Sequence, residues 1–323
     1  MSIASARRRI GRTDLFVSPV AMGCWPIAGV TSIDVTEEGS LATLEAALDC
    51  GITFFDTAYV YGYTGESERL IGRALGHRRD EIVIASKGGI EWGPDKKQVR
   101  DARPKTIKRQ CEESLQRLGT DAIDLYYLHA PDGKTPLAET AGAFRELLDD
   151  GKILSVGVSN FDKAAQYEEF HAVCQISADQ PHYNMLQREI EAETLPWCVA
   201  HGVSVMVYWP LMKGLLAGKM GRDHKFDPRD GRQKYPAFHG EEWEKTQDFV
   251  DKLRPIADAG GKSVAQLVIA WTIQRPGITA ALCGAKRPEQ IRETAAAMDW
   301  TLTPEQLAVI DRAIAERGPV PLR

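Results

Sequence analysis

Four side chains that suit acid–base chemistry follow the apolar runs of the chain. Asp56 ends the apolar run 52–55, and Tyr61 comes five residues later in the same loop. Lys87 ends the next apolar run, and His129 ends the one after that. A tyrosine hydroxyl can donate a proton to a carbonyl oxygen, and a nearby ammonium group stabilises the tyrosinate that forms. A carboxylate would keep that ammonium charged, while a neutral imidazole could orient the carbonyl group.

Taken singly, each of these residues has an ordinary structural explanation. Asp56 could cap the segment that follows it, and Lys87 could be a solvated charge at a rim. His129 could be a hydrogen-bonded core histidine, and Tyr61 a packing ring. Their shared position at the ends of apolar runs favours a common site over four independent explanations. A barrel enzyme that uses Lys87 as a Schiff base, such as an aldolase, remains an alternative at this point.

The elements that position these residues form a repeating pattern. Strand-like apolar runs alternate with amphipathic helical segments, and a glycine such as Gly51 or Gly119 follows several of the helices. This rhythm predicts a single α/β domain over residues 1–323, a closed parallel (β/α)8 TIM barrel. Residues 7–18 are predicted to form an N-terminal β-hairpin that closes the bottom of the barrel. The predicted strands lie at residues 19–23, 52–55, 81–86, 124–128, 153–158, 178–180, 203–207 and 278–282.

Composition narrows the functional class. The chain has 323 residues, 43% of them hydrophobic, and a net charge of -5 from 40 Lys and Arg against 45 Asp and Glu. This balance gives no basic surplus for nucleic-acid binding. No apolar run is long enough for a membrane span, and the arginines at 7–9 precede no signal-type segment. The six cysteines are widely spaced, which indicates reduced thiols in a cytoplasmic protein without a metal site.

Two further segments have sequence patterns that predict a loop and a helix start. Residues 212–240 contain glycine, proline and many basic residues, which predicts a long loop over the barrel mouth. Residues 260–263 read GGKS, like the end of a phosphate-binding loop, but Ile256 stands where that loop requires its first glycine. Ser263 is therefore expected to start a helix with a capping box, as is Thr303.

The ordered motifs of the chain resemble those of the aldo-keto reductase superfamily over nearly its whole length, including the branch of bacterial reductases related to potassium-channel β subunits. The motifs are FDTAxxYG at 55–62 with Ser67 and Glu68, then Ser86-Lys87, then LHxPD at 128–132. The resemblance implies that Tyr61 is the general acid, that Lys87 and Asp56 support it, and that His129 orients the carbonyl group. It also implies an extended nicotinamide dinucleotide bound without a Rossmann fold, usually in its phosphorylated form.

The same resemblance assigns the cofactor contacts. Ser159, Asn160 and Gln180 would hold the carboxamide, and Tyr208 would stack on the nicotinamide ring. Lys219, in a GLLxGK segment, would meet the pyrophosphate, and Lys286 the 2′-phosphate. The remaining predicted cofactor residues are Gly23, Cys24, Trp25, Asp56, Trp209, Pro210, Leu211, Gly214, Arg232, Gly284, Gln290, Glu293 and Thr294.

Several residues depart from the family pattern. Trp209 replaces a small residue, Cys283 a proline or isoleucine, and Thr294 an asparagine that often touches adenine. Lys286 replaces a frequent arginine and would bind phosphate as a point charge, not through a bidentate fork. NADP (NADPH) is therefore the expected cofactor, with NAD possible.

The expected partner is a small-molecule carbonyl substrate, bound by a monomer or homo-oligomer. Trp25, Tyr59, Trp92 and His182 are the candidate pocket residues, and their aromatic character suggests an apolar aldehyde or ketone. The expected function is NADP(H)-dependent reduction of that carbonyl group to an alcohol by hydride transfer, with Tyr61 as the acid. The alternative is a regulatory subunit that senses the redox state of bound NADP and has slow or vestigial reductase activity.

Overall fold

Eight parallel strands form a closed barrel in which each strand pairs with its neighbours in sequence and the last pairs with the first. The structure is a computed structural model that describes residues 6–320. The last strand of the barrel pairs with the first, and Gly284 lies opposite Gly23 in this pairing. This arrangement confirms the predicted (β/α)8 TIM barrel. The strands are β3 (Val20–Gly23), β4 (Phe54–Asp56), β5 (Val83–Gly88), β8 (Leu125–Leu128), β9 (Val156–Ser159), β10 (Ala178–Gln180), β11 (Ser204–Val207) and β12 (Ile278–Gly284).

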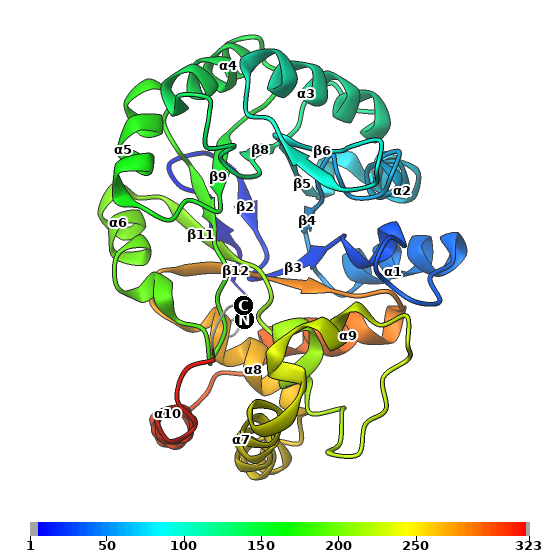
Figure 1. Ribbon diagram of the computed structural model, residues 1–323, viewed down its shortest axis with the longest axis vertical. Helices are drawn as coiled ribbons and strands as arrows, with labels where there is room; N and C mark the ends of the chain where they lie inside the picture. The colour runs from blue at the N-terminus through cyan, green and yellow to red at the C-terminus, as the bar shows by residue number, and fades with distance from the viewer. Residues whose placement is uncertain (1–5, 321–323) are drawn as a thin grey trace.

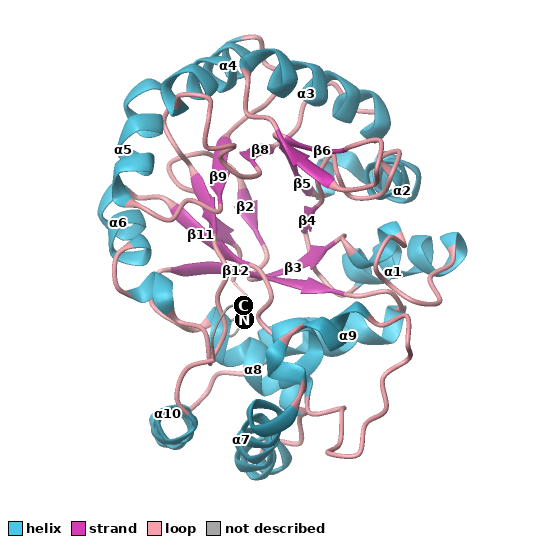
Figure 2. Ribbon diagram, viewed as in Figure 1, coloured by secondary structure: helices cyan, strands magenta, loops and turns pink. Residues whose placement is uncertain are grey.

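Helices surround the barrel, as Figures 1 and 2 show. Successive helices α1 to α5 pack against one another, α9 packs against α1, and α10 packs against α7 outside the ring. The helices are α1 (Glu37–Asp49), α2 (Glu66–Leu75), α3 (Pro104–Leu118), α4 (Leu137–Asp149), α5 (Ala164–Val173), α6 (Thr194–His201), α7 (Gly240–Ala259), α8 (Val264–Ile273), α9 (Pro288–Ala295) and α10 (Pro304–Arg317).

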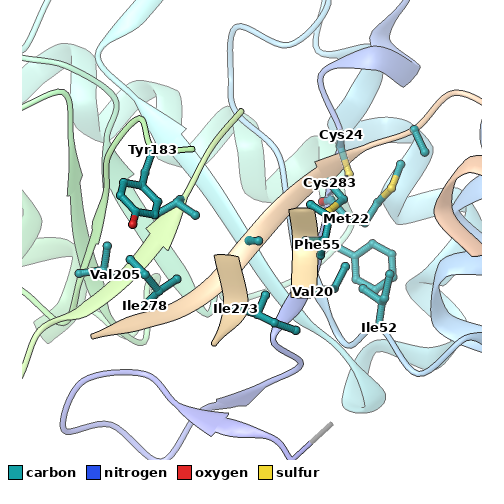
Figure 3. Close-up of a cluster of buried hydrophobic side chains, with 14 of the residues drawn as sticks. Val20, Met22, Cys24, Ile52, Phe55, Tyr183, Val205, Ile273, Ile278 and Cys283 are labelled. Carbon is teal, nitrogen blue, oxygen red and sulfur yellow. Dashed lines mark hydrogen bonds between the residues drawn. The ribbon is translucent and has the colours of Figure 1, made fainter. Parts of the chain in front are cut away.

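The larger hydrophobic core lies between the barrel and the helices. Alternate strand residues point outward into this layer, because successive side chains of a strand face opposite sides of the sheet. Val20 and Met22 of β3 and Phe55 of β4 are fully buried there, next to Ile52, as Figure 3 shows. The other faces of the same strands fill the inside of the barrel, where Phe54 and Met206 are fully buried.

The N-terminal hairpin closes one end of the barrel, as predicted. Strands β1 (Arg8–Arg9) and β2 (Phe16–Val17) pair antiparallel. Ile10 and Val17 are fully buried in the same cluster as the barrel interior. The backbone N–H of Gly11 donates to Ser204 Oγ at 2.8 Å, and Ser204 is the first residue of β11. The hairpin therefore covers the amino ends of the strands.

The structure adds elements that the sequence pattern did not indicate. A short hairpin of β6 (Ile90–Trp92) and β7 (Gln98–Arg100) follows β5. The segment 212–240, expected to be irregular, contains three 3₁₀ helices: η4 (Met212–Ala217), η5 (Gly231–Lys234) and η6 (Pro236–Phe238).

The capping boxes predicted at Ser263 and Thr303 are confirmed at the starts of α8 and α10. The GGKS segment therefore turns the chain from α7 into α8. Within residues 6–320, no helix is both long and apolar enough to cross a membrane.

Gly157 in β9 offers a direct test of barrel packing. A Cβ atom at this position would lie 2.3 Å from the ring of Tyr127. We expect Gly157→Ala to lower the free energy of unfolding by about 1–3 kcal/mol, because a fully buried ring would have to move. Denaturant unfolding measures the change. Gly142→Ala in α4, where a Cβ would meet nothing within 4 Å, should instead be neutral or stabilising. Equal stability of Gly157→Ala and the wild type would contradict this packing.

Candidate active site

Three neighbouring strands deliver charged and polar side chains to the carboxyl end of the barrel. Asp56 is the last residue of β4, Lys87 lies near the end of β5, and His129 follows β8 directly. These strands are adjacent in the barrel, so their ends lie side by side. Lys87 and Asp56 are 1% exposed, while Tyr61 and His129 are partly exposed. The charged pair is thus buried beneath two groups that solvent can reach.

The Lys87 ammonium lies at the centre of the site. Its Nζ donates to Asp56 Oδ1 at 2.6 Å and to the backbone oxygen of Thr57 at 2.8 Å. The same Nζ lies 3.3 Å from the Tyr61 hydroxyl. Three oxygen atoms therefore surround the ammonium, which fixes its position relative to the tyrosine. The sequence did not indicate the contact with Thr57, because every residue type has a backbone oxygen.

Burial acts against both charges of the pair. It raises the pKa of the Asp56 carboxyl and lowers the pKa of the Lys87 ammonium. The attraction between the two groups opposes both shifts, and a hydrogen bond from Gln180 Nε2 to Asp56 Oδ2 at 2.7 Å further stabilises the carboxylate. We therefore assign the ionised state to both groups at neutral pH.

Tyr61 and His129 keep their neutral forms. Burial, together with the charge of Asp56, raises the pKa of the Tyr61 phenol well above its usual value. Burial and the positive charge of Lys87 lower the pKa of the His129 imidazole well below its usual value. The two rings lie 6.0 Å apart, edge to face. A protonated phenol thus lies beside a neutral imidazole, whose buried Nδ1 has no hydrogen-bond partner among the described residues.

Two tryptophans hold the loop that carries Tyr61. The Trp92 indole N–H donates to the backbone oxygens of Val60 at 3.0 Å and Gly62 at 2.8 Å. The ring of Trp25 packs edge to face on Tyr61, with 5.0 Å between centroids. Both of these predicted pocket residues therefore lie at the site. Their contacts fix the position of the tyrosine on two sides.

A polar network extends from the acid group across the barrel. Ser159 Oγ donates to the backbone oxygen of Gln180 at 2.7 Å. Asn160 Nδ2 donates to the backbone oxygen of His129 at 2.9 Å, and the Tyr208 hydroxyl donates to Asn160 Oδ1 at 3.1 Å. The structure thus brings the four residues predicted to hold the nicotinamide end together next to the acid group.

The histidine predicted for the pocket lies beside this network. The His182 ring is 5.4 Å from that of Tyr208 and 5.2 Å from that of Trp209. Burial and the charge of Lys213 lower the pKa of His182 to about 4, so this imidazole is also neutral at pH 7. His182 and Tyr208 form an isolated parallel bridge beyond the ends of β10 and β11.

The residues predicted for the pyrophosphate and for the adenosine end also lie close together. Lys219, just after η4, forms an ion pair with Glu293 of α9. The Lys286 backbone N–H donates to Gln290 Oε1 at 2.9 Å, and Lys286 Nζ donates to the backbone oxygen of Ile33 at 2.6 Å. No carboxylate pairs with the Lys286 ammonium among the described residues.

The backbone after Trp209 is strained. Met212, Lys213 and Gly214 have φ angles of 47°, 55° and 91°, three successive residues in the left-handed region. The strain places Lys213 Nζ 3.3 Å from the centroid of the Trp209 ring and 4.7 Å from that of Tyr235. Burial, with the nearby charges of Lys234 and Arg232, lowers the pKa of Lys213 to about 8. The sequence reasoning missed Lys213, because nothing in residue type indicates this run of conformations.

Arg232 supports this strained segment. Its guanidinium pairs with Asp230 at 2.6 Å, and Nη1 donates to the backbone oxygen of Lys213 at 3.3 Å. Arg232 therefore supports the backbone at 213–214. Its contact with a cofactor phosphate stays a prediction.

Three predicted contacts are not supported by the structure. The Tyr59 hydroxyl donates to Glu113 on α3 at 2.7 Å and its ring lies under Arg117, so Tyr59 belongs to the helix layer and not to the pocket. The Cys24 thiol is buried in the core outside the barrel, where Sγ donates to the Met22 backbone oxygen. Thr294 is 6% exposed and its hydroxyl bonds back to its own helix, which leaves it no donor for adenine.

Comparison with known proteins decides the family. Residues 19–315 match the model of the aldo/keto reductase family. The chain belongs to the aldo/keto reductase family. It is 37% identical to aldo-keto reductase YhdN of Bacillus subtilis over 299 residues, covering 92% of this chain and 89% of that protein.

A second curated relative and a solved structure extend the comparison. The NADH-specific methylglyoxal reductase of Escherichia coli is 33% identical over 322 residues, 95% of this chain and 97% of the relative. The structure of the glycerol dehydrogenase AKR11B4 from Gluconobacter oxydans superposes with a TM-score of 0.91 and 37% identity, covering 99% of this chain and 98% of that one. The names of these two relatives of this aldo/keto reductase thus specify different substrates, methylglyoxal and glycerol.

A buried carboxylate behind the site gives this aldo/keto reductase a further anchor. Glu68 of α2 is fully buried and accepts hydrogen bonds from Ser86 Oγ at 2.6 Å and from Arg117 Nη1 at 3.2 Å. Ser86 precedes Lys87 in β5. The Ser67-Glu68 motif, noted in the sequence without a role, therefore ties the helix after the Tyr61 loop to the strand that carries the lysine.

The buried ion pair can be tested by removing one partner. We expect Lys87→Met to lower the free energy of unfolding by about 3–5 kcal/mol, because Asp56 would remain buried without its cation. Adding Asp56→Asn should restore part of the loss, since no unpaired charge then remains. Denaturant unfolding at pH 8 of the wild type and both variants measures the effect. A Lys87→Met protein as stable as the wild type would mean that the pair is not ionised.

Proposed function

We propose that the chain reduces aldehydes or ketones to alcohols with a nicotinamide dinucleotide, and that Tyr61 donates the proton. The observation that carries this proposal is the Tyr61 hydroxyl 3.3 Å from an ammonium group that Asp56 binds at 2.6 Å. This is the arrangement that a phenol needs to release a proton, because the ammonium stabilises the tyrosinate as it forms. Tyr61 is partly exposed and its ring packs edge to face with Trp25 and His129, so we expect the carbonyl group to approach beside these two rings.

Each residue of the site has a defined role in this reaction. The neutral His129 side chain donates a hydrogen bond that orients the carbonyl oxygen. Tyr61 then transfers its hydroxyl proton to that oxygen as negative charge develops on it. A bound reduced nicotinamide supplies the hydride to the carbonyl carbon. Lys87 stabilises the tyrosinate until solvent returns its proton, while Asp56 keeps Lys87 charged and in position.

The residues present fit a nicotinamide dinucleotide. Asn160 and Gln180 supply the amide groups that a carboxamide pairs with, and the half-buried ring of Tyr208 and the exposed ring of Trp209 supply faces for stacking. Lys213 is a half-buried cation for which no ion pair is found among the described residues, as expected where a phosphate binds.

We propose NADPH as the preferred form, with Lys286 as the cation for the 2′-phosphate. NADH remains an alternative, since the name of one relative specifies it.

Substitution of Tyr61 tests the acid. We expect Tyr61→Phe to lower kcat by about 10²–10⁴-fold, the contribution of general acid catalysis, while cofactor affinity is unchanged. Steady-state reduction of a panel of aldehydes and ketones, with cofactor binding followed by fluorescence, measures both quantities.

Tyr63→Phe is the matched control for this experiment. Tyr63 lies in the same loop, is 48% exposed and contacts Trp92 and Lys96 with its ring. Its hydroxyl can be removed without disturbing those contacts, so activity should be retained. Wild-type turnover by Tyr61→Phe would refute the role of Tyr61. A wild-type protein that binds the cofactor but reduces none of the carbonyl compounds would contradict the enzymatic proposal.

Substitution of Lys286 tests the cofactor preference. We expect Lys286→Met to weaken NADPH binding by about tenfold or more and to leave NADH binding unchanged, because only NADPH carries the 2′-phosphate. Fluorescence titration with both dinucleotides measures the ratio of the two Kd values. Lys245→Met on α7, whose ammonium pairs with Glu241, controls for the loss of one surface charge. Equal weakening of both dinucleotides would show that Lys286 does not recognise the 2′-phosphate.

A further inference from the structure

A cavity lies at the amino end of the barrel, opposite the catalytic residues. It has a volume of about 220 Å³. Its lining includes Arg12 in the turn of the N-terminal hairpin, Arg145 of α4 and His201 at the end of α6. Ser177, which immediately precedes β10, also contributes to the wall. The cavity therefore lies a strand's length from Ser159 and Gln180, which end β9 and β10 at the site described above.

The cavity is cationic. Two arginines and one histidine line it, and the lining contains no aspartate or glutamate. This composition is unusual in a chain with 45 acidic against 40 basic residues. No ion pair of Arg12 or Arg145 is found among the described residues, whereas arginines such as Arg79 and Arg117 pair with carboxylates. Two guanidinium groups at one cavity are thus not paired with a carboxylate among the described residues.

The first of these groups lies close to the backbone that follows α6. A Cβ at Gly202 would lie 3.4 Å from Arg12 Nε, an ordinary van der Waals contact. The hairpin turn is itself fixed, because Gly11 bonds to Ser204 and a Cβ at Gly11 would lie 2.6 Å from the Ser177 oxygen. The backbone that carries the exposed Arg12 side chain is therefore fixed beside the cavity.

A histidine, His201, lies beside the two arginines in the wall of the cavity. His201 Nδ1 lies 2.8 Å from the Trp197 backbone oxygen, which favours the tautomer with the proton on Nδ1. Its ring stacks on Trp197, with centroids 4.0 Å apart, and its Nε2 lies 3.8 Å from Glu168. The aliphatic side chains of Leu148, Leu154, Val156 and Ile176 form the apolar part of the lining.

We propose that this cavity binds a small oxyanion, a carboxylate or phosphate group, between Arg12 and Arg145. Guanidinium groups bind such anions through paired, charge-assisted hydrogen bonds. The volume suits an anion with few carbon atoms, since each water molecule alone occupies about 30 Å³ of liquid. The ligand would join the N-terminal hairpin to α4 and so stabilise the folded barrel without taking part in catalysis.

Calorimetry with two probes tests the site. Inorganic phosphate and hexanoate are each titrated at low ionic strength into protein saturated with NADPH, which fills the phosphate sites proposed at the barrel mouth. We expect at least one probe to bind with a Kd in the millimolar range. We expect Arg12→Gln combined with Arg145→Gln to weaken binding by more than about tenfold, and Arg312→Gln, an exposed arginine of α10, to leave it unchanged.

A local readout keeps the test decisive if the double variant folds poorly. NMR of labelled histidines in the wild-type protein should show the His201 ring signals shifting with the probe while those of His129 and His182 stay fixed. Binding of phosphate alone would identify a phosphate ligand, and binding of hexanoate alone a carboxylate. Absence of binding by both probes, or binding that moves no His201 signal and survives the double substitution, would overturn the proposal.

Discussion

The buried ion pair between Lys87 and Asp56 is the interaction on which the candidate active site depends. Two opposite charges lie 2.6 Å apart at 1–2% exposure, where an unpaired charge would be very costly. The surrounding structure supplies the hydrogen bonds that such a pair requires. Lys87 also donates to Thr57, and Asp56 accepts from Gln180. The pair is therefore fully bonded before any substrate binds, and the Tyr61 hydroxyl takes the remaining position beside the ammonium.

Closure of the barrel makes this arrangement possible. In the order of strands, β10 lies four places from β4 in either direction, so Gln180 reaches Asp56 from the opposite side of the barrel. An open sheet would hold these two strands far apart. Gly157 contributes in the same way, since only a residue without a side chain leaves room for the Tyr127 ring next to it. Stability of the barrel and geometry of the site thus rest on the same interior.

The sequence predicted the parts of the site that depend on strand ends. Carboxyl ends of parallel strands must meet at one face, so Asp56, Lys87, His129 and Gln180 could be placed together from their positions alone. It could not predict which way a loop residue points. Tyr59 and Tyr61 are two residues apart, yet one contacts α3 and the other Lys87, because the turn after Asp56 is fixed by tertiary bonds such as that from Tyr59 N to the Lys87 oxygen.

Other failures of prediction have the same origin in tertiary structure. Cys24 follows a strand end like the catalytic residues, but its thiol points into the layer beneath the helices. Lys213 reaches Trp209 through a run of left-handed residues that propensity disfavours for lysine and methionine. Departures from local preference of this kind concentrate at functional sites, where the surrounding structure stabilises them. Lys213 could therefore be identified as a candidate phosphate contact from the structure but not from the sequence.

The pH dependence of a single turnover tests the central claim most directly. With cofactor bound beforehand, the rate of carbonyl reduction is measured by stopped flow across the pH range. Burial raises the pKa of Tyr61 and lowers that of His129, so both groups keep their neutral forms between their ordinary values of about 6.5 and 10 and somewhat beyond. The account predicts a rate that is flat from about pH 6 to about pH 9. A rate that changes tenfold for each pH unit within that range would contradict it.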